Sequence, residues 1–166
     1  SNDDTILLDA ASRKNLELDY HPSGQRQFTL LGVLDKTITA MGSRCLHRWL
    51  NRPLRDQTIL KSRYDSVEAL LVGETYTHIR ELLRSVGDIE RISSRVALKS
   101  ARPRDLLVLR DTFSILPELQ KQLATIESTG IQQLATHISQ QPELLTLLQQ
   151  AIIENPPVII RDGGVI

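Results

Sequence analysis

Apolar residues recur every three or four positions along most of the chain, a spacing that predicts a mainly helical protein. The clearest helix covers residues 40–51, where one face is apolar, the opposite face is polar and basic, and Pro53 ends the helix. The apolar positions are Met41, Cys45, Leu46, Trp49 and Leu50. We expect Cys45, Trp49 and Leu50 to belong to the core, because thiols and large apolar side chains on such a face are commonly buried.

Capping residues, glycines and prolines indicate where other helices begin and end. Thr29 can cap a short helix over residues 30–34, and Asp88 can cap a helix that starts at residue 89. The same signals predict further helices over residues 58–73, 76–86, 131–138 and 142–152.

The longest apolar stripe follows Pro103, and proline suits the first turn of a helix. Its apolar residues step by three or four positions as far as Ile126, which is close to a heptad pattern. Pro117 lies inside this stripe, and an internal proline removes a helical hydrogen bond. We therefore expect a kink at Pro117, or a break there between two helices.

Short apolar or alternating runs near both ends of the chain predict β-structure. Residues 5–8 and 15–18 fit a small β element around residues 10–13, and residues 158–160 read as a strand before a glycine turn. The predicted fold class is thus mainly α: an irregular multi-helix bundle with small β elements at the N- and C-terminal ends.

The two ends of the chain are typical of a piece cut from a longer protein. Ser1 and Asn2 resemble the remnant of a cleaved expression tag, so residues 1–2 are left out of the fold. Val165 and Ile166 look like the start of another strand, at which the sequence stops. The length of 166 residues suits one domain, so we expect residues 3–166 to form a single, partial domain.

Charge is distributed unevenly, although 20 basic and 20 acidic residues cancel over the whole chain. Residues 41–110 carry 14 basic and 8 acidic groups, a net charge of +6, whereas residues 1–40 carry −2 and residues 111–166 carry −4. Two helical faces within the basic segment concentrate these cations. The first carries Arg44, Arg48, Arg52 and Arg55, and the second carries Arg91, Arg95, Lys99 and Arg102.

Two interpretations of these cations stay open. They are solvated helix faces that form ion pairs with acidic neighbours such as Asp56, Asp88 or Glu90, or they dock an acidic partner surface, a neighbouring domain or a phosphate backbone. The candidate interdomain or phosphate contacts are Arg44, Arg48, Arg91, Arg95 and Lys99. The zero net charge and the lack of interleaved aromatic residues make them a weak signal for nucleic acid.

No combination of residues suggests a catalytic, cofactor or metal site. No glycine is followed by lysine, so the phosphate-binding P-loop is missing from the sequence. The four histidines lie far apart, and the single Cys45 leaves no zinc-ligand cluster. No apolar run approaches the roughly 18–20 residues that a membrane span needs. One cysteine fits a reducing compartment, and we expect a cytoplasmic protein that is not itself an enzyme.

Five blocks of sequence carry a resemblance to a known family. They are residues 7–18 (LLDAASRKNLEL), residues 29–35 (TLLGVLD) with much of 41–54, residues 86–91 (VGDIER), residues 101–106 (ARPRDL) and residues 156–166 (PPVIIRDGGVI). Each block alone is weak, but together they occur in family order and span the chain after the first residues. The sequence resembles the first half of the core domain of the MutS family of DNA mismatch repair proteins, up to the clamp insertion.

The resemblance implies a structural core or relay segment that links an ATPase to a DNA clamp. The parent protein would bind mismatched duplex DNA in an ATP-dependent way, use ATP and Mg²⁺, act as a homodimer, and hold this segment against other MutS domains in the same polypeptide. The mismatch-wedging aromatic and the Walker residues of the family lie outside this chain. No catalytic, cofactor-binding or base-reading residue is therefore carried over to it.

Two other classes of function stay open from the residues alone. The chain would be either a stand-alone helical nucleic-acid-binding module that uses the arginines of residues 41–110, or a helical protein-interaction module.

Overall fold

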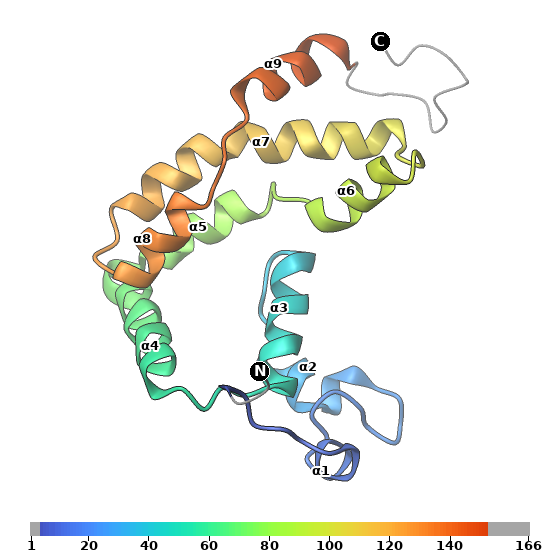
Figure 1. Cartoon of the computed structure of the whole chain (residues 1–166), viewed down its shortest axis with the longest axis vertical. Helices are drawn as coiled ribbons and strands as arrows, with labels where there is room; N and C mark the ends of the chain where they lie inside the picture. The colour runs from blue at the N-terminus through green and yellow to red at the C-terminus, as the bar shows by residue number, and fades with distance from the viewer. Residues whose placement is uncertain (1–3, 153–166) are drawn as a thin grey trace. The chain divides into compact units, whose positions relative to one another are not determined.

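A computed structural model describes residues 4–152, and this part of the chain is mainly helical, as the periodicity predicts (Figure 1). The chain divides into two compact units, residues 1–67 and residues 68–166. The first unit contains α1 (Ala10–Asn15), the 3₁₀ turn η2 (Arg26–Phe28), α2 (Leu30–Leu34) and α3 (Ala40–Asn51). The helix α4 (Gln57–Leu71) crosses the boundary between the units. The second unit continues with η3 (Val72–Glu74), α5 (Thr75–Leu83), α6 (Ile89–Ala97), α7 (Pro103–Ala124), α8 (Thr129–Thr136) and α9 (Pro142–Ala151).

Side-chain caps start the short helices of the first unit. The Asp9 carboxylate accepts a hydrogen bond from the Ser12 N–H at 2.6 Å, and the Thr29 hydroxyl accepts one from the Gly32 N–H at 3.0 Å. Thr39 caps α3 in the same way through the Gly42 N–H, at 2.9 Å. These caps supply partners for the backbone N–H groups that the first turn of a helix leaves free.

The β-structure predicted near the N-terminus is wrong. Residues 4–152 contain no strand, and residues 5 and 54 form only an isolated antiparallel bridge, in which the Ile6 N–H donates to the Pro53 carbonyl at 2.7 Å. Residues 10–15 form α1 instead, because the Asp9 cap favours a helix there. The strand predicted at residues 158–160 lies outside the described residues.

The bounds predicted for α3 are confirmed, but the predicted burial of Trp49 is wrong. No residue of α3 is fully buried; Cys45 and Leu50 are half-buried, and Trp49 is 47% exposed. The indole ring of Trp49 packs against Arg63 of α4, whose guanidinium carbon lies 3.6 Å from the ring centroid. The apolar stripe therefore identified the correct face but not how much of the protein covers it.

α7 is the longest helix of the second unit, and it packs against α5, α6, α8 and α9 (Figure 1). The buried cluster around it consists of Ile79, Leu119, Ile126 and Ile131. The helix continues through the exposed Pro117, so the predicted break between two helices is wrong. A proline inside a helix costs about 3 kcal/mol. Leu116, Leu119 and Leu123 pack into the cluster on both sides of Pro117, and this packing holds the helix together.

The loop between α5 and α6 lies directly against the middle of α7. The Gly87 N–H donates to the Thr112 hydroxyl at 2.9 Å, and that hydroxyl lies 3.4 Å from the Ser85 carbonyl oxygen, to which it donates. The side chain of Thr112 is only 2% exposed. A Cβ atom at Gly87 would collide with a methyl group of Val108, so the close approach of loop and helix requires glycine here.

Candidate interaction surfaces

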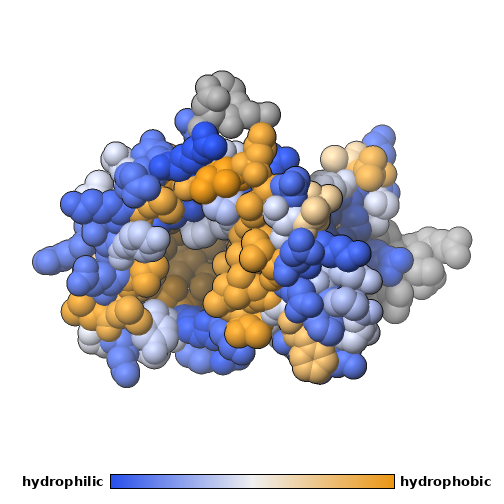
Figure 2. Space-filling model, turned by 90° about the horizontal axis from the view of Figure 1, so that it is seen from below, coloured by the Kyte–Doolittle hydropathy of each residue, from blue (hydrophilic) through white to orange (hydrophobic). Residues whose placement is uncertain are grey.

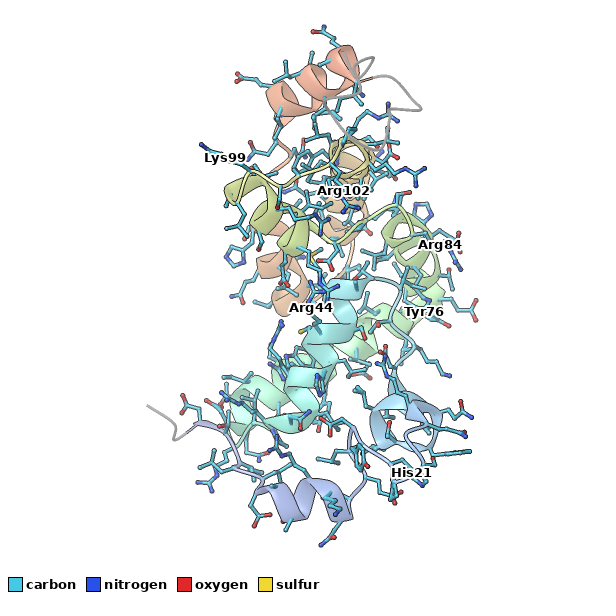
Figure 3. The ribbon with its side chains drawn as sticks, turned by 90° about the vertical axis from the view of Figure 1, so that its right-hand side faces the viewer. His21, Arg44, Tyr76, Arg84, Lys99 and Arg102 are labelled. Carbon is cyan, nitrogen blue, oxygen red and sulfur yellow. The ribbon has the colours of Figure 1, made fainter. Side chains whose placement is uncertain are left out.

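The five cations selected from the sequence fall into two groups. Arg44 and Arg48 lie on α3 in the first unit, whereas Arg91 and Arg95 lie on α6 and Lys99 follows that helix in the second unit. Figure 3 labels one member of each group, Arg44 and Lys99. Each group has a different set of carboxylates around it.

The α3 group borders a hollow of about 350 Å³ in the first unit, which Arg44 and His47 line together with Asp19, Arg26, Leu31 and Ser43. The His47 Nε2 atom lies 2.8 Å from an Asp19 carboxylate oxygen, and this hydrogen bond lowers the pKa of Asp19. Arg48, by contrast, is exposed. The hollow is therefore built largely from polar groups that bind one another.

Asp35 joins three segments of the first unit. Its carboxylate accepts hydrogen bonds from the hydroxyls of Ser43 and Thr37, each at 2.5 Å, and from the Arg26 guanidinium at 2.8 Å. These bonds lower the pKa of Asp35 to about 2, and the bond from the Ser43 hydroxyl has the largest effect. Asp35 is thus ionised at neutral pH and links η2, the end of α2 and the start of α3.

Arg95 is committed to an ion pair inside the second unit. Its Nε and Nη2 atoms lie 2.9 and 2.7 Å from the two carboxylate oxygens of Asp105. Asp105 also accepts the Arg102 N–H at 2.9 Å, and the hydrogen bond from Arg95 is the main cause of its lowered pKa. This arrangement links α6 to the first turn of α7. A bidentate arginine–carboxylate pair of this kind stabilises the contact and also fixes the relative orientation of the two side chains.

Arg91 is also close to a carboxylate: its Nε atom lies 3.5 Å from Asp88, one turn earlier. The ion-pair interpretation of the second basic face therefore holds for Arg91, with a partner that the sequence suggested. It also holds for Arg95, with a partner that the sequence did not suggest, because Asp105 lies ten residues away on another helix.

Lys99 differs from both arginines. It is exposed, its backbone has a φ of 55°, and no side-chain partner for it is found within residues 4–152. Two more exposed cations follow it, Arg102 at the start of α7 and Arg104 in its first turn. Arg104 was not among the candidates selected from the sequence. The signal that could have identified it is its position: it lies two residues after Arg102 and three residues before the apolar Leu107.

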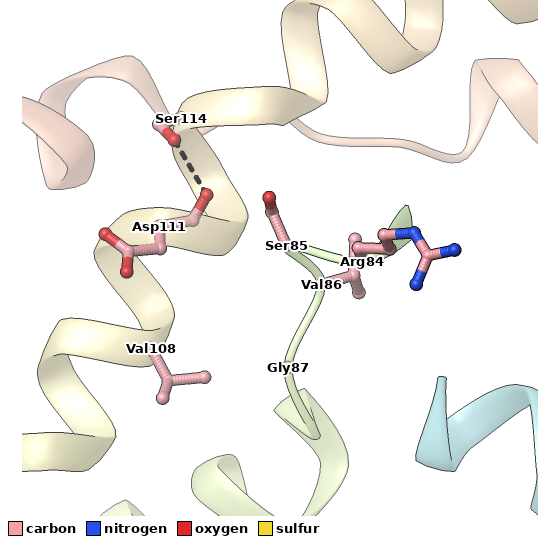
Figure 4. Close-up of a pocket in the computed structure, with 7 residues that line it drawn as sticks. All are labelled: Arg84, Ser85, Val86, Gly87, Val108, Asp111 and Ser114. Carbon is pink, nitrogen blue, oxygen red and sulfur yellow. Dashed lines mark hydrogen bonds between the residues drawn. The ribbon is translucent and has the colours of Figure 1, made fainter. Parts of the chain in front are cut away.

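A hollow of about 420 Å³ in the second unit lies between the α5–α6 loop and α7 (Figure 4). Its polar side chains already bind near neighbours: the Ser114 hydroxyl donates to the Asp111 carbonyl at 2.7 Å, Asp111 pairs with Arg110, and Arg84 pairs with Glu81. The Ser114 hydroxyl is thus bonded to a backbone carbonyl, and the Asp111 carboxylate to an arginine. We therefore interpret it as a gap left by packing, not as a catalytic site.

Large apolar side chains also remain at the surface of the protein, between hydrophilic ones (Figure 2). Within the described part of the chain, no three histidine, cysteine or acidic side chains are grouped so that they could hold a metal ion. No helix between Asp4 and Ile152 is long and apolar enough to cross a membrane. The exposed apolar and basic side chains are thus the candidate contact surfaces of the described residues.

Replacing Trp49 by alanine should lower the free energy of unfolding by only about 1–2 kcal/mol. A fully buried tryptophan costs about 3–5 kcal/mol when truncated, but this residue is 47% exposed and the Arg63 guanidinium packs on its ring. Urea unfolding followed by far-ultraviolet circular dichroism measures the loss. A loss of 3 kcal/mol or more would show that the indole is buried after all.

A family model described as MutS domain III matches residues 11–166. The match covers all the described helices except the first residue of α1.

Proposed function

Because the chain belongs to the MutS family as its domain III, the core domain of these mismatch repair proteins, we propose that it acts as a structural relay between an ATPase and a DNA clamp. In this proposal the chain performs no chemistry itself. It transmits changes of state by moving as a packed helical body.

The observation that carries this proposal is the way α7 is held along its length. Arg95 binds Asp105 at its start, Thr112 binds the α5–α6 loop at its middle, and the Gln120 side chain donates to the Ala135 and Ile138 carbonyls at 3.0 and 3.3 Å near its end. A 22-residue helix that is fastened at three levels to its neighbours moves with them and does not bend independently.

The remaining features proposed for the parent protein follow from the family. They are ATP-dependent binding of mismatched duplex DNA, contacts between this chain and other MutS domains, a homodimeric state and a cytoplasmic location. ATP and Mg²⁺ do not fit the residues of this chain, because the sequence has no P-loop and residues 4–152 have no cluster of metal-binding side chains. We therefore propose them for the parent protein alone.

A DNA-binding titration separates the relay from a stand-alone nucleic-acid-binding module. Fluorescence anisotropy of matched and G·T-mismatched duplexes with the 166-residue chain should show weak binding, about 10⁻⁴–10⁻⁶ M or weaker at physiological salt, without preference for the mismatch. The physical reason is that the net charge is zero and that Arg91 and Arg95 already face carboxylates. Nanomolar binding that persists at high salt, or a clear mismatch preference, would contradict the relay.

A further inference from the structure

The connection between α6 and α7 forms an exposed basic tip, which we define as Leu98, Lys99, Arg102 and Arg104. Leu98 is 77% exposed, and the three cations are exposed as well. Within residues 4–152 the side chains of Lys99 and Arg104 make no hydrogen bond or ion pair, whereas the positive charge of Arg102 helps to lower the pKa of the nearby Asp105 carboxyl. Figure 3 shows the Lys99 side chain projecting away from the helices. The tip thus combines one apolar side chain with three exposed positive charges, of which the charge of Arg102 has the Asp105 carboxylate nearby.

The backbone of this tip is held in place on both sides. At the end of α6 the Lys99 N–H donates to the Val96 carbonyl at 3.0 Å and the Ser100 N–H donates to the Arg95 carbonyl at 2.8 Å, the two bonds of a Schellman motif. At the start of α7 the Pro103 side chain is fully buried, and Asp105 binds both the Arg95 guanidinium and the Arg102 N–H. The tip is therefore pre-organised, which reduces the entropy lost on docking.

Lys99 occupies a backbone position that glycine would fill with less strain. A Schellman motif places this residue in the left-handed region, and the φ of Lys99 is 55°. Strained residues of this kind concentrate at functional positions. Lysine at this position places a positive charge beside the exposed Leu98 side chain, at the cost of a strained, left-handed backbone.

We propose that the basic tip docks an acidic surface with an apolar hollow, on another domain of the same MutS polypeptide. Leu98 enters the hollow, and Lys99, Arg102 and Arg104 pair with carboxylates around it. This arrangement of an apolar centre and a charged rim is typical of protein interfaces. A phosphate backbone would use the three cations but would gain nothing from Leu98. The proposal rests on the proposed function, since a relay needs contacts with its neighbouring domains.

Photo-cross-linking in the full-length parent protein tests this docking. Leu98→benzoylphenylalanine should give, on irradiation, a link to another domain of the same polypeptide, within a few residues of aspartate or glutamate, as mapped by mass spectrometry of the linked peptides. The matched control is Leu134→benzoylphenylalanine on α8, a leucine that is 63% exposed and lies outside the tip. Adding K99E, R102E and R104E should reduce the yield of the Leu98 link at least about fivefold.

Three results would overturn the docking proposal: a link to bound duplex DNA, a yield no higher than that of the Leu134 control, or a yield that the three charge reversals leave unchanged. Circular dichroism of the charge-reversed protein verifies that it is folded. The relay is judged separately, by the ATP-driven release of DNA in the protein without the cross-linker. A failed cross-link therefore removes the docking site without deciding whether the chain is a relay.

Discussion

Gly32→Ala should lower the free energy of unfolding of the first unit by about 3 kcal/mol, at the upper end of the range for overpacking. A Cβ atom at Gly32 would collide with the backbone carbonyl oxygen of Arg26 and would lie 2.8 Å from its carbonyl carbon. Backbone atoms cannot rotate away as a flexible side chain does, so α2 must separate from η2. Trp49 is the only tryptophan, and its fluorescence during urea unfolding reports on this unit.

The matched control for Gly32 is Gly24→Ala. Gly24 has a φ of 71°, but a Cβ atom there would meet nothing within 4 Å, so alanine should cost only about 1 kcal/mol for the left-handed backbone. Equal losses at the two glycines would show that the contact between α2 and η2 is not as close as the structure has it.

Leu119→Ala should lower the free energy of unfolding of the second unit by about 2–5 kcal/mol. Leu119 is 6% exposed and lies in the buried cluster with Ile79, Ile126 and Ile131, so truncation removes apolar contacts and leaves a cavity. Urea unfolding followed by far-ultraviolet circular dichroism measures the loss. Leu134→Ala is the matched control, because its side chain is 63% exposed and its loss should stay below about 1 kcal/mol. Similar losses for the two leucines would contradict the placement of the core around α7.

Local signals in the sequence were sufficient to locate most of the helices. Thr29 and Asp88 cap α2 and α6 as predicted, and Pro103 opens α7, because a cap acts only on the first turn of its own helix. The helix α1 was missed, and of the two outcomes expected at Pro117, a kink or a break, the break is wrong. The apolar run at residues 5–8 and the alternation at residues 15–18 suggested strands on both sides of the segment that the Asp9 cap starts as a helix, and at Pro117 the packing of α7 outweighed the local effect of proline.

Burial and pairing could not be predicted in the same way, because both depend on residues that are distant in the sequence. The apolar stripe of α3 predicted on which face of the helix Trp49 lies. It did not predict that Trp49 is 47% exposed and packs against Arg63. The basic face of α6 gave Arg95 and Lys99 as equivalent candidates. The fold separates them, since it brings Asp105 to Arg95 and leaves Lys99 exposed in a left-handed turn.

The relay itself is tested most directly by loosening α7 from the α5–α6 loop in the full-length parent protein. Thr112→Val keeps the shape of the side chain but leaves the Gly87 N–H without its partner, a loss of about 1–3 kcal/mol. Ser114→Ala is the control on the same helix, because its hydroxyl only donates to the Asp111 carbonyl. Stopped-flow fluorescence would follow the ATP-driven release of a labelled mismatched duplex. We predict that Thr112→Val slows this release about tenfold. Basal ATP hydrolysis and DNA affinity without ATP should stay within about twofold of the unmodified protein. Ser114→Ala should change none of these three quantities. Release by Thr112→Val at the unmodified rate would contradict a relay through this helix.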